Sequence, residues 1–230
     1  MDEKNKRIAV LGASRGFGRS LSLKYMIESG SEDKFFLASR KIKSSMFSLE
    51  NSLQGHLSKA SWENVDFTQV KLYSEFILRL RDFNPTHIFY VAGGGPFGPF
   101  ASKQFKDHLW AIRLSFLFPA QLIHMALLGE FSNLRQLICV GSAIAESQAD
   151  PGAASYSAAK HGLKGLLSTL VEEPCPIDLR LFSPPYMKTD MVPEKSALER
   201  KLTLKDPGDV AQSFYEWAKT SSGPWHFMLN

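Results

Sequence analysis

A tyrosine and a lysine stand four residues apart in the segment Ser155–Lys160, and a serine stands upstream at position 142. On a helix, residues i and i+4 lie one turn apart on the same face, so Tyr156 and Lys160 would be neighbours. A phenol with a pKa of about 10 is a poor base, but an ammonium about 4 Å away can lower that pKa by up to about three units. The spacing therefore predicts that Tyr156 acts as a general acid and base beside Lys160.

The same spacing occurs at Tyr215 and Lys219, so the pattern alone has little meaning. The surrounding sequence separates the two pairs. The apolar run 134–140 leads to Ser142, whose hydroxyl could hold the same carbonyl oxygen as Tyr156, whereas the second pair has no such partner upstream. We predict that Ser142, Tyr156 and Lys160 are catalytic and that Tyr215 is a surface or packing residue.

Three glycines, Gly12, Gly16 and Gly18, follow the apolar run 8–11 and precede an amphipathic segment. This order predicts a buried strand, a tight turn and a helix. Glycines allow the backbone to approach a ligand closely, and the amides and dipole of a helix N-terminus favour an anion. The turn is predicted to hold the phosphates of a dinucleotide. A later Gly-x-Gly-x-x-Gly pattern over 93–98 is interrupted by proline and is not expected to open a helix.

The second expected strand, 34–38, ends in Ser39 and Arg40 with no acidic residue. In a dinucleotide fold this strand end meets the adenosine ribose, where an acid favours NAD and a basic residue accommodates the 2′-phosphate of NADP. Arg40, with Arg15 able to approach from the glycine turn, therefore favours NADP(H), although a solvated basic loop would have the same composition. Asp66, after the third strand, could contact the adenine amino group or cap the next helix.

Strand and helix patterns alternate along the chain. We expect a single domain over residues 1–230, a doubly wound parallel α/β sheet of the Rossmann-like type with helices on both faces. The expected strands are 8–11, 34–38, 57–65, 87–92, 134–140, 177–182 and 226–229, and the expected helices follow the glycine turn and occupy about 44–53, 70–83, 107–129, 155–171 and 207–218.

The segment 107–129 is apolar on nearly every face, which one sheet cannot cover. We therefore expect this helix to pack against a second subunit in a homodimer or homotetramer. Pro119 should kink it.

Composition limits the other classes of function. The chain has 230 residues, 44% of them hydrophobic, and a formal net charge of +4 with the basic residues spread out, so neither nucleic-acid nor membrane binding is expected. The charged N-terminal segment is unlike a signal peptide, and we expect a cytoplasmic protein. Cys139 and Cys175 are expected to be reduced, and the histidine spacing predicts no metal site.

These motifs resemble those of the short-chain dehydrogenase/reductase family over almost the whole chain. Gly12-Ala-Ser-Arg-Gly-Phe-Gly18 is similar to the family's glycine loop, Tyr90-Val-Ala-Gly93 stands where the family usually has Asn-Asn-Ala-Gly, and Ser183-Pro-Pro185 with Thr189 resembles its Pro-Gly segment and threonine near the nicotinamide. The resemblance implies that Ser142, Tyr156 and Lys160 are catalytic and that NADP(H) is bound by Gly12, Ser14, Arg15, Gly16, Phe17, Gly18, Ser39, Arg40, Asp66, Ala92, Gly93, Tyr156, Lys160, Pro184 and Thr189.

Three residues depart from the family pattern. Tyr90 and Val91 replace the asparagine pair, Pro185 replaces a glycine, and Arg113 stands where the family has an asparagine that holds a relay water beside the lysine. These departures motivate a second hypothesis, a weak or inactive NADP(H)-binding sensor of the same fold.

The first hypothesis is an NADPH-dependent oxidoreductase that reduces a small-molecule carbonyl compound to an alcohol, or the reverse. A sugar-nucleotide epimerase is disfavoured because too few residues follow the sixth strand for a substrate domain. Segments 96–100, 144–150 and 186–202 are expected to line the substrate pocket, with a lid over about 184–205. Their phenylalanine, methionine and proline content favours an apolar substrate.

Overall fold

The computed structural model describes residues 5–42, 54–146, 150–192, 203–220 and 223–229. In this part of the chain, seven strands form one sheet in the order β3-β2-β1-β4-β5-β6-β7, and all neighbouring pairs are parallel. The strands are β1 (Arg7–Leu11), β2 (Lys34–Ser39), β3 (Ala60–Asn64), β4 (His87–Tyr90), β5 (Gln136–Val140), β6 (Asp178–Ser183) and β7 (His226–Met228).

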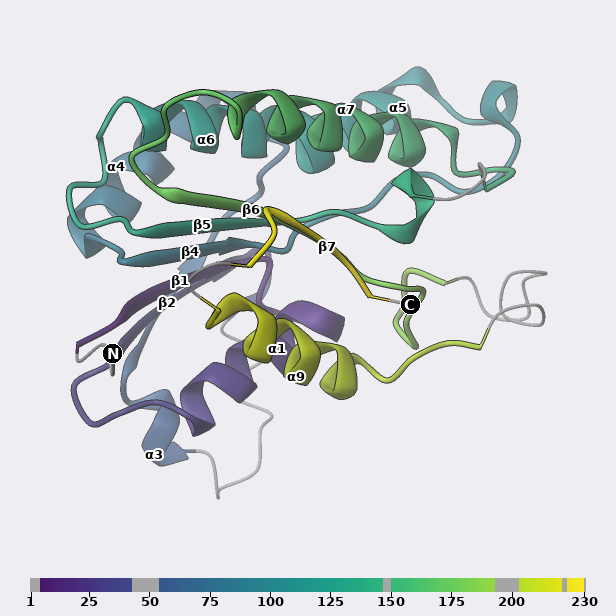
Figure 1. Ribbon diagram of the computed structural model, residues 1–230. Coiled ribbons are helices and arrows are strands. Elements are labelled where there is room, and N and C mark those ends of the chain that lie inside the picture. Colours follow the sequence, from purple (N-terminus) through teal and green to yellow (C-terminus); the bar gives the residue numbers. More distant parts are fainter. Residues whose placement is uncertain (1–4, 43–53, 147–149, 193–202, 221–222, 230) are drawn as a thin grey trace.

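Helices cover both faces of this sheet (Figure 1). On one side lie α1 (Gly16–Ile27) and α9 (Pro207–Ala218), which pack against each other, with the short α3 (Gln54–Leu57) nearby. The other side carries α4 (Tyr73–Phe83), α5 (Phe105–Ile112), α6 (Phe118–Leu127) and α7 (Ala154–Leu170). The predicted doubly wound α/β fold is therefore confirmed.

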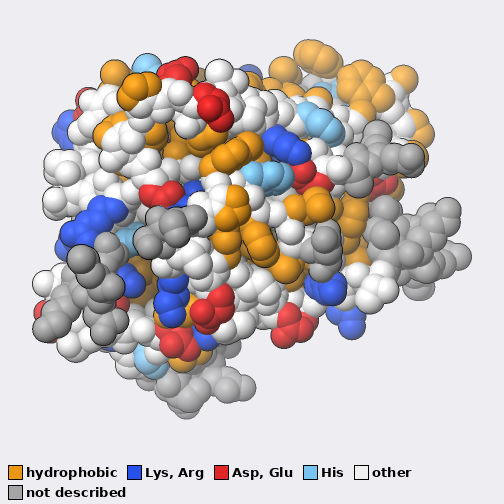
Figure 2. Space-filling view, in the orientation of Figure 1, with side chains coloured by type: hydrophobic (Ala, Val, Ile, Leu, Met, Phe, Trp, Pro, Cys, Tyr) orange, Lys and Arg blue, Asp and Glu red, His pale blue; other side chains and the backbone are white. Residues whose placement is uncertain are grey.

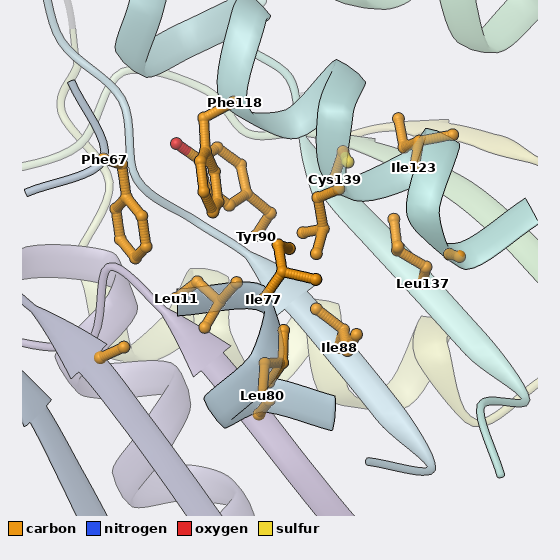
Figure 3. Close-up of a cluster of buried hydrophobic side chains, with 14 of the residues drawn as sticks. Leu11, Phe67, Ile77, Leu80, Ile88, Tyr90, Phe118, Ile123, Leu137 and Cys139 are labelled. Carbon is orange, nitrogen blue, oxygen red and sulfur yellow. The ribbon is translucent and has the colours of Figure 1, made fainter. Parts of the chain in front are cut away.

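The central strands are buried on both faces, which explains their continuous apolar runs. Figure 3 shows the cluster beneath α4 and α6, where Tyr90 and Phe118 lie close together. The cluster on the α1 and α9 side is rich in aromatic rings, and Phe214 contacts both Phe89 and Phe182. Because the strands are all parallel, their carboxyl ends lie at one edge of the sheet.

The expected boundaries agree with the structure to within a few residues, except at the third strand. That strand covers only 60–64 because residues 54–57 form a helical turn before it. The expected helix at 44–53 lies outside the described residues, and so does most of the later part of the expected lid, 193–202.

The expected long helix is divided into α5, a π-helical turn (Arg113–Leu117) and α6. In this turn the Phe118 amide donates to the Arg113 carbonyl, five residues earlier. Pro119 has no amide hydrogen to donate to the next carbonyl, that of Leu114, and the Tyr90 hydroxyl donates to it instead at 2.5 Å. The irregular turn is thus completed by a side chain from β4.

Residues 105–127 are also long and apolar enough to span a membrane, with a mean hydropathy of 1.3 in the most apolar window, of which 44% is buried inside the protein. A core helix of a soluble protein has the same properties. Here the run packs on α7, and Phe118 and Leu122 are fully buried.

Candidate functional site

A cavity of about 360 Å³ opens at the carboxyl edge of the sheet. This edge includes the gap between β1 and β4, where the chain reverses its winding direction and where open α/β sheets bind ligands. All the residues that the sequence singled out for catalysis or cofactor binding line this one cavity: Gly12, Ser14, Arg15, Gly16, Phe17, Gly18, Ser39, Arg40, Asp66, Ala92, Gly93, Ser142, Tyr156, Lys160, Pro184 and Thr189.

Tyr156 and Lys160 occupy successive turns at the start of α7, and Ser142 follows the end of β5. The Ser142 hydroxyl is close enough to the Tyr156 phenol to lower the pKa of that phenol. The Lys160 ammonium is buried, lies 5.6 Å from the centroid of the Tyr156 ring and donates to the carbonyl of Val140 at 2.6 Å. The fold therefore brings the three predicted catalytic side chains together.

The prediction that Tyr156 has a lowered pKa is wrong for this structure. Burial raises the pKa of Tyr156 to about 12, and the Ser142 hydroxyl offsets this only in part. Burial also lowers the pKa of Lys160 to about 8. Burial is the largest cause of both pKa shifts, so at neutral pH Tyr156 holds its proton and can act as an acid.

The glycine turn allows a close approach at two points. Gly12 has a φ of +111°, and a Cβ there would lie 2.5 Å from the amide nitrogen of Ala92. A Cβ on Gly18 would lie 2.2 Å from the Gly12 carbonyl oxygen. Arg15, the residue before α1, makes no side-chain capping bond, so the first amides of α1 remain available to an anion.

The end of β2 also presents free donors to the cavity. Ser39 is buried, and its hydroxyl has no hydrogen-bond partner among the described residues. Arg40 is exposed, 6.0 Å from the ring of Trp110, and makes no ion pair with a described acid. A 2′-phosphate would supply the acceptors that both side chains need, so the cavity fits NADP(H).

Arg15 and Asp66 have partners of their own. Arg15 pairs with Asp190, 3.3 Å away, in the segment after β6, and both side chains are exposed. One carboxylate oxygen of Asp66 accepts bonds from the amide and the hydroxyl of Thr68, at 3.0 and 2.7 Å. Asp66 therefore caps the turn that follows it and also lines the cavity. The predicted capping role and the predicted contact with adenine are thus compatible.

The structure also accounts for the unusual residues near the lysine. Tyr90 is used to complete the π-helical turn. Arg113 is exposed, and its charge offsets only in part the burial that raises the pKa of Tyr73 to about 12. The expectation that Arg113 stands at the position of the family's asparagine beside Lys160 stays a prediction.

The glycines of the later Gly-x-Gly-x-x-Gly pattern serve helix packing. A Cβ on Gly93 would lie 3.3 Å from the Lys160 ammonium, and one on Gly95 would lie 2.8 Å from the Tyr156 Cβ. This loop approaches α7 closely and opens no helix, as expected. The second Tyr-x-x-x-Lys pair lies elsewhere: Tyr215 packs edge-on against Tyr25, with ring centroids 4.9 Å apart.

Sequence reasoning missed a buried polar cluster behind Ser142. The Glu146 carboxylate is 6% exposed, accepts a bond from the Ser183 hydroxyl at 2.8 Å, and pairs with His226 at 2.8 Å and with Lys164. Burial alone would raise the pKa of Glu146, but the bonds from Lys164 and Ser183, with the charge of His226, hold that pKa below its ordinary value. Four distant segments contribute, so no local motif indicates the cluster.

His108 was missed for the same reason. Its ring is buried, contacts the Ser155 hydroxyl at 2.6 Å and the Phe100 carbonyl at 3.1 Å, and stacks on the Phe100 ring. These contacts fix the position of the first turn of α7, which carries Tyr156.

Figure 2 shows hydrophobic side chains gathered at the upper right of the molecule, on the side where Figure 1 labels α5. Phe97, Phe100 and Phe105, in the loop before α5 and at its first residue, are exposed.

Comparison with known proteins agrees with this geometry. The family model for short chain dehydrogenases matches residues 6–200, and no curated protein matches the sequence. The chain therefore belongs to the short-chain dehydrogenase family and has the fold of those oxidoreductases.

Solved structures show the same fold at low identity. A short-chain dehydrogenase from Burkholderia cenocepacia J2315 in complex with NADP has a TM-score of 0.81 and 17% identity, covering 98% of this chain and 96% of that one. One from Sphingobium yanoikuyae in complex with NADPH has a TM-score of 0.81 and 16% identity, covering 96% and 86%. One from Streptomyces avermitilis has a TM-score of 0.79 and 21% identity, covering 100% and 89%.

Proposed function

We propose that the protein is an NADPH-dependent reductase that converts a carbonyl compound to an alcohol, or catalyses the reverse reaction. The observation that carries this proposal is that Ser142, Tyr156 and the buried Lys160 ammonium line one cavity together with the glycine turn.

In this proposal each side chain has one task. The Ser142 hydroxyl donates to the substrate's carbonyl oxygen and fixes its position. When bound, the nicotinamide supplies the hydride that reduces the carbonyl carbon. Tyr156 gives its phenolic proton to the oxygen, which completes the alcohol, and its raised pKa keeps that proton available at neutral pH. The Lys160 ammonium stabilises the phenolate until solvent returns a proton.

The preference for NADPH over NADH is supported by the end of β2. Among the described residues, the Ser39 hydroxyl has no hydrogen-bond partner and the Arg40 guanidinium makes no ion pair, and both residues line the cavity. Residues 39–43 include no acid to accept from a ribose 2′-hydroxyl. The NADP and NADPH complexes of structural relatives agree with this preference.

A panel of ketones and aldehydes with purified protein tests the proposal. We expect at least one compound to cause loss of NADPH absorbance, with kcat/KM at least about tenfold higher for NADPH than for NADH. Binding of NADPH without oxidation by any compound would favour the sensor instead.

We also propose that the protein forms a homodimer or homotetramer. Leu109, Leu117 and Leu128, along α5 to the end of α6, are exposed on the helical run that the sequence marked as apolar all round. Sedimentation should show concentration-dependent association, and a monomer at all concentrations would contradict the proposal.

A further inference from the structure

The cavity contains a second phenol and a carboxylate beyond Tyr156. The hydroxyl of Tyr186 donates to the Asp150 carboxylate at 3.2 Å, and both residues line the cavity. Burial is the main cause that raises the pKa of Tyr186 to about 12, with smaller contributions from Asp150 and from Tyr156. Tyr186 is thus within electrostatic reach of the proposed proton donor.

Two loops hold this pair in place. Asp150 begins a turn in which its own carbonyl accepts from the Ala153 amide at 3.1 Å, and the Gly152 carbonyl accepts from the Gly98 amide at 2.9 Å. The Tyr186 carbonyl accepts from the Lys205 amide at 3.0 Å. Each side chain therefore projects from backbone that is itself hydrogen-bonded.

Asp150 differs from the other two acids of the cavity, Asp66 and Asp190, in the partners of its carboxylate. Asp66 accepts from Thr68, and Asp190 pairs with Arg15. The second carboxylate oxygen of Asp150 accepts no bond from a described residue, and the Tyr186 oxygen retains a lone pair after donating its proton. The pair therefore presents acceptors and a negative charge to whatever occupies this part of the cavity.

We infer that Asp150 and Tyr186 select the substrate, and that this substrate is a ketone or aldehyde whose apolar body carries a hydroxyl or a protonated amine away from the reacting carbonyl. Phe97, Ile144 and Met187 line the same cavity and suit the apolar body. A substrate with a carboxylate at the same place is disfavoured by the charge of Asp150. The inference rests on the proposed carbonyl reduction.

Four matched probes test this inference: benzylacetone and its ring-hydroxylated, aminomethyl and carboxyl derivatives. We expect wild-type protein to prefer the aminomethyl and hydroxylated ketones, and the ratio of kcat/KM for the aminomethyl ketone to that for benzylacetone should fall about 10- to 100-fold in Asp150→Asn. Tyr186→Phe should lower the corresponding ratio for the hydroxylated ketone. The matched control Asp82→Asn, an exposed acid of α4 that does not line the cavity, should leave both ratios unchanged.

Calorimetry with NADPH-saturated protein separates this inference from the proposed function. If no probe is reduced, the proposed function fails for these ketones. The relative affinities of the four probes for the NADPH-saturated protein then test the inference on their own. Tighter binding of the aminomethyl ketone than of benzylacetone, lost in Asp150→Asn, supports the inference. Equal binding of the four probes, or binding of none, would overturn it.

Discussion

At the scale of single residues, Arg40 is the side chain that should distinguish NADPH from NADH. Arg40→Ala removes an exposed guanidinium from the end of the cavity where the 2′-phosphate is expected. We expect the Kd for NADPH to rise about tenfold or more, because a charge-assisted hydrogen bond is lost, and the Kd for NADH to stay nearly unchanged. Lys41→Ala is the matched control, since Lys41 does not line the cavity. Equal losses for both cofactors would contradict the assignment.

We expect the buried Lys160 ammonium to lower the free energy of unfolding, although the proposed reaction needs it. Because burial lowers its pKa from 10.5 to about 8, the unfolded chain binds this proton more tightly, and stability should rise with pH between these values. Lys160→Met should abolish turnover yet raise the free energy of unfolding by about 1–3 kcal/mol at neutral pH, with a smaller gain in alkali. Chemical unfolding across this pH range measures both effects. A variant that is less stable at neutral pH would show a structural role instead.

At the scale of elements, the π-helical turn depends on a bond between β4 and the helix that follows it. Tyr90→Phe should lower the free energy of unfolding by about 1–3 kcal/mol, since the Leu114 carbonyl would be buried without a donor. Pro119→Ala restores a backbone amide that can donate to the Leu114 carbonyl. Tyr90→Phe should therefore lower the free energy of unfolding by less in the Pro119→Ala variant than in the wild type.

A double-mutant cycle by urea unfolding measures this coupling. Tyr73→Phe is the control, because the Tyr73 hydroxyl bonds to the Phe67 carbonyl and should cost the same in both backgrounds. Additive effects of Tyr90→Phe and Pro119→Ala would contradict the proposed compensation.

The same elements show what the sequence can and cannot predict. Apolar runs and glycine or proline punctuation were enough to locate the strands, the glycine turn and the start of α7, because these depend on local pattern. The π-helical turn was not predictable, since it depends on a tertiary bond from Tyr90. The direction of the Tyr156 pKa shift was also missed, because burial becomes known only when the chain is folded.

At the scale of the whole molecule, the Glu146 cluster joins the site to the C-terminal edge of the sheet. Glu146 follows the turn that carries Ser142, Lys164 lies on α7, Ser183 ends β6 and His226 begins β7. The cluster therefore joins four segments of the chain, one of which follows Ser142 of the proposed active site.

This cluster should make stability depend on pH in the acid range. The pKa of the Glu146 carboxyl is below its ordinary value of 4.5, so the stabilisation is complete above that pH and is lost as pH falls through the lowered pKa. Glu146→Gln should reduce the free energy of unfolding at neutral pH, and the difference from wild type should shrink in acid. A difference that is the same at both pH values would contradict this role.

The most direct test of the account is a single turnover with Tyr156→Phe. Loss of NADPH absorbance should be measured with a ketone that the wild type reduces, and the Kd for NADPH should be measured in parallel. The account predicts that Tyr156→Phe binds NADPH with nearly wild-type affinity but reduces the ketone at least about a hundredfold more slowly, because the proton donor is missing. Reduction at the wild-type rate would contradict the central claim that Tyr156 supplies the proton.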